Sequence, residues 1–228
     1  MYSGRSSYLI APVARLRKDE IVWLANHFCE HRHAYLNHYT CYLRENPIGR
    51  REAYVDIETS NLRADYGICY CYCFKVSGSE KIIERVITKK ELRTCLDKEV
   101  VKQFIKDLLE FDRTYGYYSS RFDIPYMRTR ALYHGLEFPG YGERYHKDLY
   151  FVCKSKLATS SKKLKVVCKT LLGDTNKTEL DPRYWITAMS GNKEALDYIV
   201  EHCRYDVIDL ERIHKKLESF YVERNTSL

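Results

Sequence analysis

The chain has 228 residues and a formal net charge of +7, and its 45% hydrophobic and 30% charged residues are typical of a globular protein rather than a disordered or fibrous one. No apolar run approaches the roughly 20 residues of a membrane span, and the N-terminus lacks the apolar core of a signal peptide. We therefore expect a cytoplasmic protein that does not enter a membrane. The positive charge favours a polyanionic partner without requiring one.

Cysteine is abundant, with nine residues in the sequence. Cys69, Cys71 and Cys73 alternate along one strand-like segment, and neighbours on one face of a strand cannot all pair with each other. Because no secretory signal is present, we expect most of these cysteines to be small buried apolar residues.

Residues 1–50 form a distinct N-terminal extension. Ile21, Leu24 and Phe28 have helical spacing, and a stretch rich in Cys and His follows. Zinc takes four thiolate or imidazole ligands in a tetrahedron, and two cysteines with two of these histidines would supply them. The spacing is not that of a standard zinc finger, and a His-rich turn can equally be solvated, so both interpretations stay open. The candidate zinc ligands are Cys29, His31 or His33, His38 and Cys41.

The next segment, YVDIE at 54–58, combines strand-forming residues with two acids. Asp56 and Glu58 are two positions apart, so they share one face of a strand. Carboxylates about 4 Å apart repel by roughly 4 kcal/mol at an effective dielectric near 20, and a divalent metal such as Mg²⁺ or Mn²⁺ would compensate. The alternative is a frayed strand end with two hydrated acids.

Residues 68–76 and 81–89 read as further antiparallel strands in hairpin succession. The apolar spacing over 97–112 predicts a helix with Asp97 as its N-cap. A strand over 115–118 then leads into a helix that starts near Asp123, which either caps that helix or points into a site at the sheet edge. Asp148 is expected to cap another helix.

Six lysines lie between Lys154 and Lys169, and such a run is either a solvated face or a track for phosphates. The last element, a helix over 192–217, has a buried apolar stripe at steps of three and four residues. His202 and Asp206 lie one turn apart beside that stripe, where they form either a surface pair or part of a site.

Three segments, YVDIE, SSRFDIP and EHCRYDVIDL, together resemble the three motifs of the DEDD superfamily of 3′–5′ exonucleases, in the same order. More narrowly, they resemble the YprB-type ribonuclease-H-like domain, a branch with many phage and archaeal-virus members. The resemblance covers about 51–218. It implies an α/β fold over 51–228, with a ribonuclease-H-like mixed sheet flanked by helices. It also implies two divalent cations, Mg²⁺ or Mn²⁺, and four metal-binding carboxylates, Asp56, Glu58, Asp123 and Asp206.

The sequence departs from that family pattern in two places. His202 is four residues before Asp206, where one branch has Tyr, while the branch that uses His has it five residues before. We expect His202 to accept a proton from the attacking water, because its reference pKa is near 6.5. Tyr118 and Ser119 stand where related domains often have Asn-Gly ahead of Phe-Asp.

Basic and aromatic residues near the middle motif would contact a single-stranded 3′ end. We expect nucleic-acid contacts from Arg121, Arg128, Lys162, Lys163 and Lys165, with Arg130 on the same polar face. Tyrosines near Tyr117, Tyr118 or Tyr126 either stack on terminal bases or belong to the core, and none of them is assigned to binding individually.

Three functions are compatible with the sequence. The first is a metal-dependent 3′–5′ exonuclease, the second a structure-specific endonuclease on the same fold, and the third a nucleic-acid-binding module without catalysis. A circular single-stranded substrate separates the first two, because only an endonuclease cuts it. The sequence does not indicate DNA or RNA, the preferred metal or the oligomeric state.

Overall fold

The computed structural model describes residues 18–45, 51–175, 181–221 and 227–228. Residues 1–49 and 50–228 are two compact units, which we describe one at a time. None of the helices in the described ranges is long and apolar enough to cross a membrane.

The smaller unit contains α1 (Lys18–Asn26) and α2 (Tyr39–Glu45), joined by a turn in which Phe28 and Ala34 form an isolated antiparallel bridge. The predicted apolar helix face is only partly buried: Leu24 is 2% exposed, but Phe28 lies beyond the helix and is 61% exposed. This unit therefore has little apolar core over the residues described.

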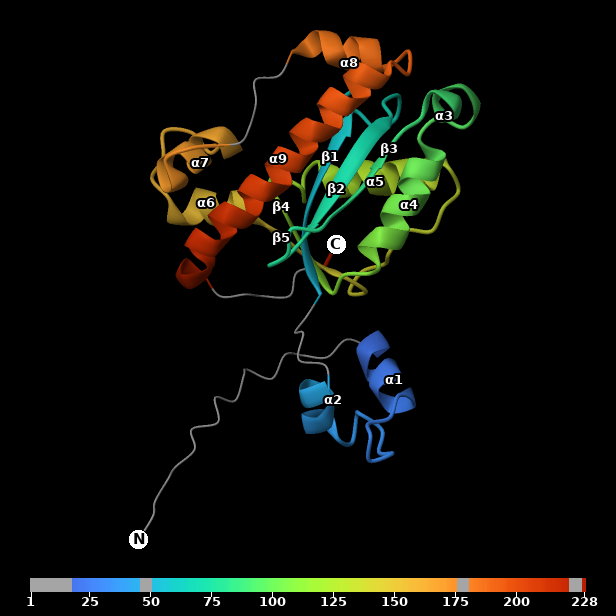
Figure 1. Cartoon of the computed structure of the whole chain (residues 1–228), viewed down its shortest axis with the longest axis vertical. Coiled ribbons are helices and arrows are strands. Elements are labelled where there is room, and N and C mark those ends of the chain that lie inside the picture. The colour runs from blue at the N-terminus through green and yellow to red at the C-terminus, as the bar shows by residue number, and fades with distance from the viewer. Residues whose placement is uncertain (1–17, 46–50, 176–180, 222–226) are drawn as a thin grey trace. The chain divides into compact units, whose positions relative to one another are not determined.

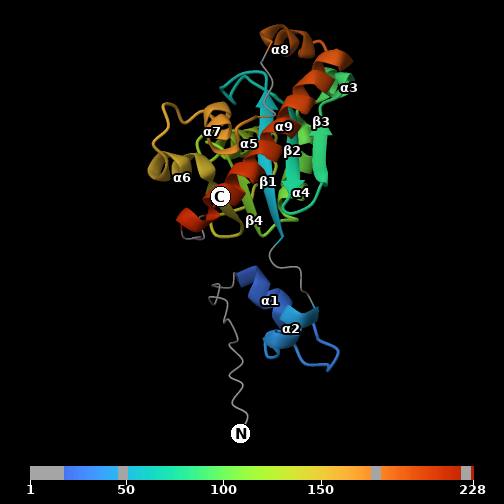
Figure 2. The same cartoon turned by 60° about the vertical axis from the view of Figure 1, so that its left-hand side comes forward.

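The larger unit is a mixed sheet with helices on both faces, as predicted (Figures 1 and 2). Within the described ranges the strands lie in the order β3-β2-β1-β4-β5. β1 is antiparallel to β2 and parallel to β4, so the carboxyl ends of β1, β4 and β5 meet at one edge. The elements are β1 (Glu52–Thr59), β2 (Cys69–Val76), β3 (Ile82–Val86), α3 (Lys89–Thr94), α4 (Lys98–Leu108), β4 (Arg113–Gly116), α5 (Asp123–Tyr133), β5 (Tyr145–Asp148), α6 (Leu149–Lys156), α7 (Leu164–Leu172), α8 (Pro182–Ala188), α9 (Lys193–Leu217) and the 3-10 turn η1 (Glu218–Phe220).

The alternating sequence of β2 explains how the two faces are covered. Tyr72 and Phe74 pack their rings against Phe104 of α4. On the other face, the thiol of Cys203 on α9 lies against those of Cys71 and Cys73. Small thiols on this face let the long helix α9 approach the sheet closely. All nine cysteines are free thiols, and all but one are buried.

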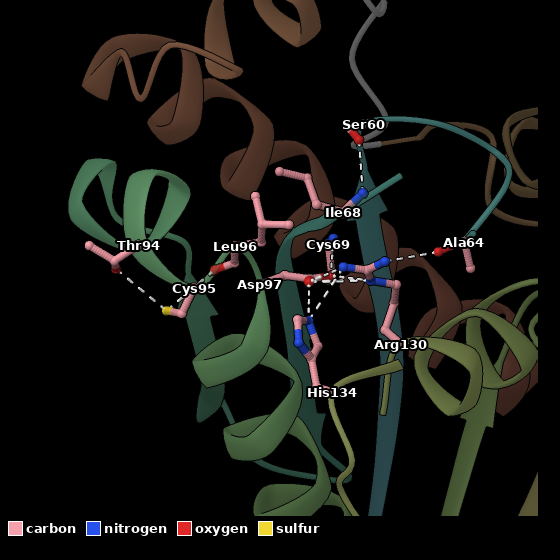
Figure 3. A network of polar contacts seen from close by, with 10 residues as sticks. All are labelled: Ser60, Ala64, Ile68, Cys69, Thr94, Cys95, Leu96, Asp97, Arg130 and His134. Carbon is pink, nitrogen blue, oxygen red and sulfur yellow. Dashed lines mark hydrogen bonds and ion pairs between the residues drawn. The ribbon is translucent and has the colours of Figure 1, made fainter. Parts of the chain in front are cut away.

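A buried polar network ties α4 and α5 to the strands (Figure 3). Asp97 precedes α4 as predicted, but its side chain makes no capping bond. Instead it accepts hydrogen bonds from Arg130 at 2.6 Å and from the amide of Cys69 at 2.9 Å, and contacts His134 Nε2 at 2.7 Å. Burial raises the pKa of Asp97, but its bonds to Arg130 and His134 outweigh that effect and lower it overall. Arg130 also bonds the carbonyl of Ala64 at 3.0 Å, so one guanidinium joins α5 to the loop after β1.

Candidate active site

Asp56 and Glu58 lie on β1, on the same face as Tyr54. The hydroxyl of Tyr54 is hydrogen-bonded to His214 Nδ1 on α9 at 2.8 Å, so this is the face that α9 covers. Both carboxylates are half-buried, and β1 stays paired with β2 through both residues. The two acids therefore lie within the sheet, not on a frayed strand end.

Asp123 is the first residue of α5, and a backbone hydrogen bond fixes its carboxylate. Its Oδ1 accepts a 3.1 Å bond from the amide of Ile57, the residue between Asp56 and Glu58. The pairing of β1 with β4 ends at Tyr54, so the carboxylate takes the acceptor position that a longer β4 would have filled. The strand-to-helix junction thus places Asp123 beside the two acids of β1.

His202 and Asp206 lie on the part of α9 that covers β1. The thiol of Cys203 donates to the carbonyl oxygen of Asp56 at 3.3 Å. His202 and Asp206 are 1% and 6% exposed, so they are not a solvated surface pair. The His202 ring packs edge-on against Trp185 of α8, with 6.2 Å between centroids.

Asp123 is close enough to Asp148 and Asp206 for their charges to affect it. The pKa of Asp123 is raised to about 7, first by burial and then by the charges of Asp148 and Asp206, against the backbone hydrogen bonds that it accepts. A divalent cation would favour the charged form of such a carboxyl group.

The donor set suits a hard divalent cation, because Asp56, Glu58, Asp123 and Asp206 offer carboxylate oxygens. Asp56 Oδ2 and Asp206 Oδ1 are shielded from solvent. Over the described ranges, groups of three or more metal-ligand atoms within 4.8 Å of one another occur only in the smaller unit. Carboxylates about 4 Å apart repel by roughly 4 kcal/mol at an effective dielectric near 20, and a cation between them would offset that repulsion.

Asp148 shapes the loop ahead of Asp123. It caps α6 as predicted, but it also accepts hydrogen bonds from the amides of Tyr118 at 2.8 Å and Ser120 at 2.9 Å. Tyr118 is held with φ at 60°, a conformation that non-glycine residues seldom adopt. This second role was missed because neither the short strand β5 nor the backbone conformation of a tyrosine gives a sequence signal.

His146 supports the same loop from β5. Its Nδ1 is hydrogen-bonded to Thr114 Oγ1 at 2.8 Å and its Nε2 to Ser119 Oγ at 2.7 Å. Burial lowers the pKa of His146 to about 3, so the ring is neutral. A Cβ at Gly116 would lie 2.1 Å from Ser119 Oγ, so β4 has to end in glycine for the loop to fold back. In this loop, Gly116 was the feature that the sequence alone could have used to indicate a tight turn after β4.

Two of the residues predicted to contact nucleic acid are arginines near α5, Arg121 just before the helix and Arg128 within it. Arg121 is exposed and lies 5.9 Å from the centroid of the Phe151 ring. Arg128 is half-buried, over the ring of Phe138 at 5.5 Å. The structure corrects the expectation for Arg130, which is 2% exposed and is held by the buried Asp97 rather than lying on the polar face.

The three lysines lie at the start of α7. The ammonium group of Lys162 bonds the carbonyl and hydroxyl oxygens of Thr159, both at 3.0 Å. Lys163 is exposed at the N-cap position, and Lys165 is half-buried on the helix. Lys163 is thus the most accessible of the three cations.

The candidate stacking tyrosines have different environments. Tyr126 is buried, and Tyr117 is half-buried and donates to the carbonyl of Lys162 at 2.6 Å. Tyr118 is 48% exposed, and its ring packs edge-on against that of Tyr150 at 4.9 Å. Tyr118 is therefore the tyrosine of this group that can meet a base.

In the smaller unit the structure brings together four of the five candidate zinc ligands. Ligand atoms of Cys29, His31, His38 and Cys41 all lie within 4.8 Å of one another. His33 is not in this group, and its ring is exposed beside that of His38 at 5.1 Å. We call these four residues the Cys/His cluster.

Comparisons with known proteins concern the larger unit. A sequence profile of the RNase H superfamily matches residues 53–218. Among solved structures, the family B DNA polymerase from the hyperthermophilic archaeon Pyrobaculum calidifontis is similar, with a TM-score of 0.59 and 19% identity. The similarity covers 75% of this chain and 25% of the polymerase chain. No curated protein sequence matches.

Proposed function

The chain belongs to the RNase H superfamily, and from this premise we propose that it is a metal-dependent 3′–5′ exonuclease acting on single-stranded nucleic acid. The observation that carries the proposal is the bond from Ile57 to Asp123, which fixes a third carboxylate beside Asp56 and Glu58. The proposal includes the narrower YprB-type assignment and gives catalysis to residues 51–228, with 1–50 as an extension.

The four acids share one role in this proposal. Asp56, Glu58, Asp123 and Asp206 would hold two divalent cations, Mg²⁺ or Mn²⁺. Such ions would lower the pKa of a water and stabilise the leaving 3′ oxygen. The burial of Asp123 and Asp206 keeps these carboxylates in fixed positions and strengthens their attraction for a cation.

His202 accepts the proton of the attacking water in this proposal. General-base catalysis contributes roughly 10²–10⁴-fold, so His202→Gln should lower turnover by about that factor and remove a limb of the pH–rate profile. Gln keeps most of the buried volume, and unchanged far-UV circular dichroism checks the fold. Unaltered turnover of the variant removes the histidine from the mechanism.

The substrate reaches the acids over the loop that carries Tyr118 and Arg121. Tyr118 is exposed beside Tyr150, and Arg121 lies over Phe151, so aromatic faces and a cation stand together just before Asp123. Stacking on an aromatic ring together with a nearby cation is how sequence-tolerant binding of single strands is achieved.

The test uses 5′-labelled single-stranded DNA and RNA with Mg²⁺ or Mn²⁺, comparing wild type with Asp56→Asn. The exonuclease yields a ladder shortened from the 3′ end, which is absent with the variant and with EDTA. Asp65→Asn, at an exposed acid in the loop after β1, is the matched control and should keep full activity.

Two other outcomes favour the competing functions. Cleavage of a circular single strand identifies an endonuclease on the same fold. Binding of labelled strands without any metal-dependent hydrolysis identifies a non-catalytic nucleic-acid-binding module and overturns the proposal.

A further inference from the structure

The Cys/His cluster has the dimensions of a tetrahedral metal site. Cys29 Sγ lies 3.4 Å from His38 Nδ1 and 3.9 Å from His31 Nδ1, and Cys41 Sγ lies 3.5 Å from His31 Nδ1. With bonds of about 2.3 Å to sulfur and 2.0–2.1 Å to nitrogen, a tetrahedral zinc ion separates its sulfur and nitrogen ligands by about 3.6 Å. The observed separations fall around this value.

The local backbone presents the ligands in two pairs. The first pair, Cys29 and His31, lies in the turn after α1. There the amide of Cys29 donates to the carbonyl of His33 at 3.0 Å, and the amide of Arg32 donates to the carbonyl of Cys29 at 2.8 Å. Arg32 has φ at 60°, which lets the turn close tightly. The second pair, His38 and Cys41, flanks the start of α2, and the amide of Cys41 bonds the carbonyl of His38 at 2.9 Å.

One charged side chain, Glu30, lies next to the ligand His31. His31 directs Nδ1 to the thiols, while its Nε2 lies 3.7 Å from Glu30 Oε1. This separation is longer than a hydrogen bond, so the Glu30 carboxylate lies near the distal nitrogen without fixing the ring.

The smaller unit has a small buried core. Among the side chains described there, the fully buried apolar ones are Leu24, Cys29 and Cys41, so two of these three belong to the cluster. The rings of Trp23, Tyr35 and Tyr42 pack against one another but are not fully buried. A segment this short rarely folds on apolar burial alone, and zinc binding supplies folding free energy to such segments.

We propose that Cys29, His31, His38 and Cys41 bind one structural Zn²⁺ that folds the N-terminal unit. The closed set of four protein ligands leaves no open position for a substrate, so the ion is structural rather than catalytic. His33 is not a ligand in this proposal. The exposed group Glu30, His31 and Glu45 shares His31 with the cluster, and the proposal assigns His31 to the zinc ion. The proposal does not depend on nuclease activity.

The experiment measures the metal content of the 228-residue chain, purified without chelator and dialysed. Wild type should carry about one zinc ion per chain. His33→Ala, the matched control, should keep it, whereas His38→Ala and Cys41→Ser should lose it. Equal loss in His33→Ala and His38→Ala, or a metal-free wild type that also fails to take up Zn²⁺, overturns the proposal.

Two measurements on the wild type avoid variants that fail to fold. Replacement of zinc by Co²⁺ should give a thiolate-to-cobalt charge-transfer band, which carboxylate ligands cannot produce. Peptide mapping after alkylation should show Cys29 and Cys41 protected until a chelator is added. A Cys29–Cys41 disulfide in the mapped peptides, or a cobalt spectrum without the thiolate band, overturns the proposal.

Discussion

In the Cys/His cluster the ligand atoms lie within 4.8 Å of one another, whereas the four acids of the candidate active site do not reach that spacing. Neutral thiols and imidazoles can approach closely without a large electrostatic cost, but carboxylates repel. The cluster is also contained in 13 residues, from Cys29 to Cys41, while the acids come from β1, α5 and α9. The comparison shows that a candidate site of sulfur and nitrogen ligands can be recognised from the proximity of its atoms alone. A candidate site made only of carboxylates has to be recognised from other observations, which here are the backbone hydrogen bond, the burial and the raised pKa of Asp123.

The largest expected effect tests whether the two sites are independent. Asp56→Asn should lower nuclease activity by about 10³-fold, since metal ions supply several kcal/mol of transition-state stabilisation. Its zinc content should equal that of the wild type. Activity assays and metal analysis on one preparation check both statements, and joint loss of activity and zinc would show that the two sites are coupled.

The next effect concerns the buried network around Asp97 and Arg130. Arg130→Met removes the guanidinium that pairs with the buried, charged Asp97. This loss should lower the free energy of unfolding by about 3–5 kcal/mol. Urea unfolding of the larger unit measures this loss. Lys193→Met, which breaks the exposed pair of Lys193 with Asp197, is the control and should change stability by no more than about 0.5 kcal/mol. Equal effects in the two variants would contradict a structural role for the network.

A smaller effect is the pH dependence of the larger unit's stability, which His146 should produce. The pKa of His146 is near 6.5 when unfolded and about 3 when folded, so below pH 6.5 the unfolded chain binds a proton that the folded chain excludes. Stability should therefore fall as pH drops from about 6.5 toward 3, with a contribution of about 2 kcal/mol at pH 5. His146→Gln should reduce this dependence in urea titrations at pH 7 and 5. An unchanged slope would show that the pKa of His146 is the same in the folded and unfolded states.

The smallest effect concerns substrate binding. Tyr118→Asn removes the ring and keeps a residue that tolerates positive φ, so it should weaken single-strand binding by about 1–2 kcal/mol, or roughly tenfold. Fluorescence anisotropy with a labelled strand measures this change. Tyr141→Asn, at a tyrosine that is 95% exposed, should bind like wild type, and equal weakening in both variants would remove Tyr118 from the binding surface.

The sequence predicted those parts of the structure that have local or periodic signals. The long helix α9, the antiparallel strands of the first half and the positions of the acids on β1, α5 and α9 follow from apolar spacing and motif order. It could not choose between His31 and His33, because both flank Arg32 and only the turn geometry directs one ring to the thiols. Arg130 was misassigned because its partner Asp97 is 33 residues away, and helix periodicity does not distinguish a buried ion pair from a polar face.

The bond between Ile57 and Asp123 would bear on ion selectivity if Asp123 binds a cation as proposed. Its Oδ1 accepts a hydrogen bond from the strand, which holds the carboxylate in one orientation. Calcium often uses both oxygens of a carboxylate and a larger, flexible coordination shell, whereas magnesium requires compact octahedral geometry with single-oxygen contacts. A carboxylate held in one orientation would suit the compact shell of magnesium better than the flexible shell of calcium.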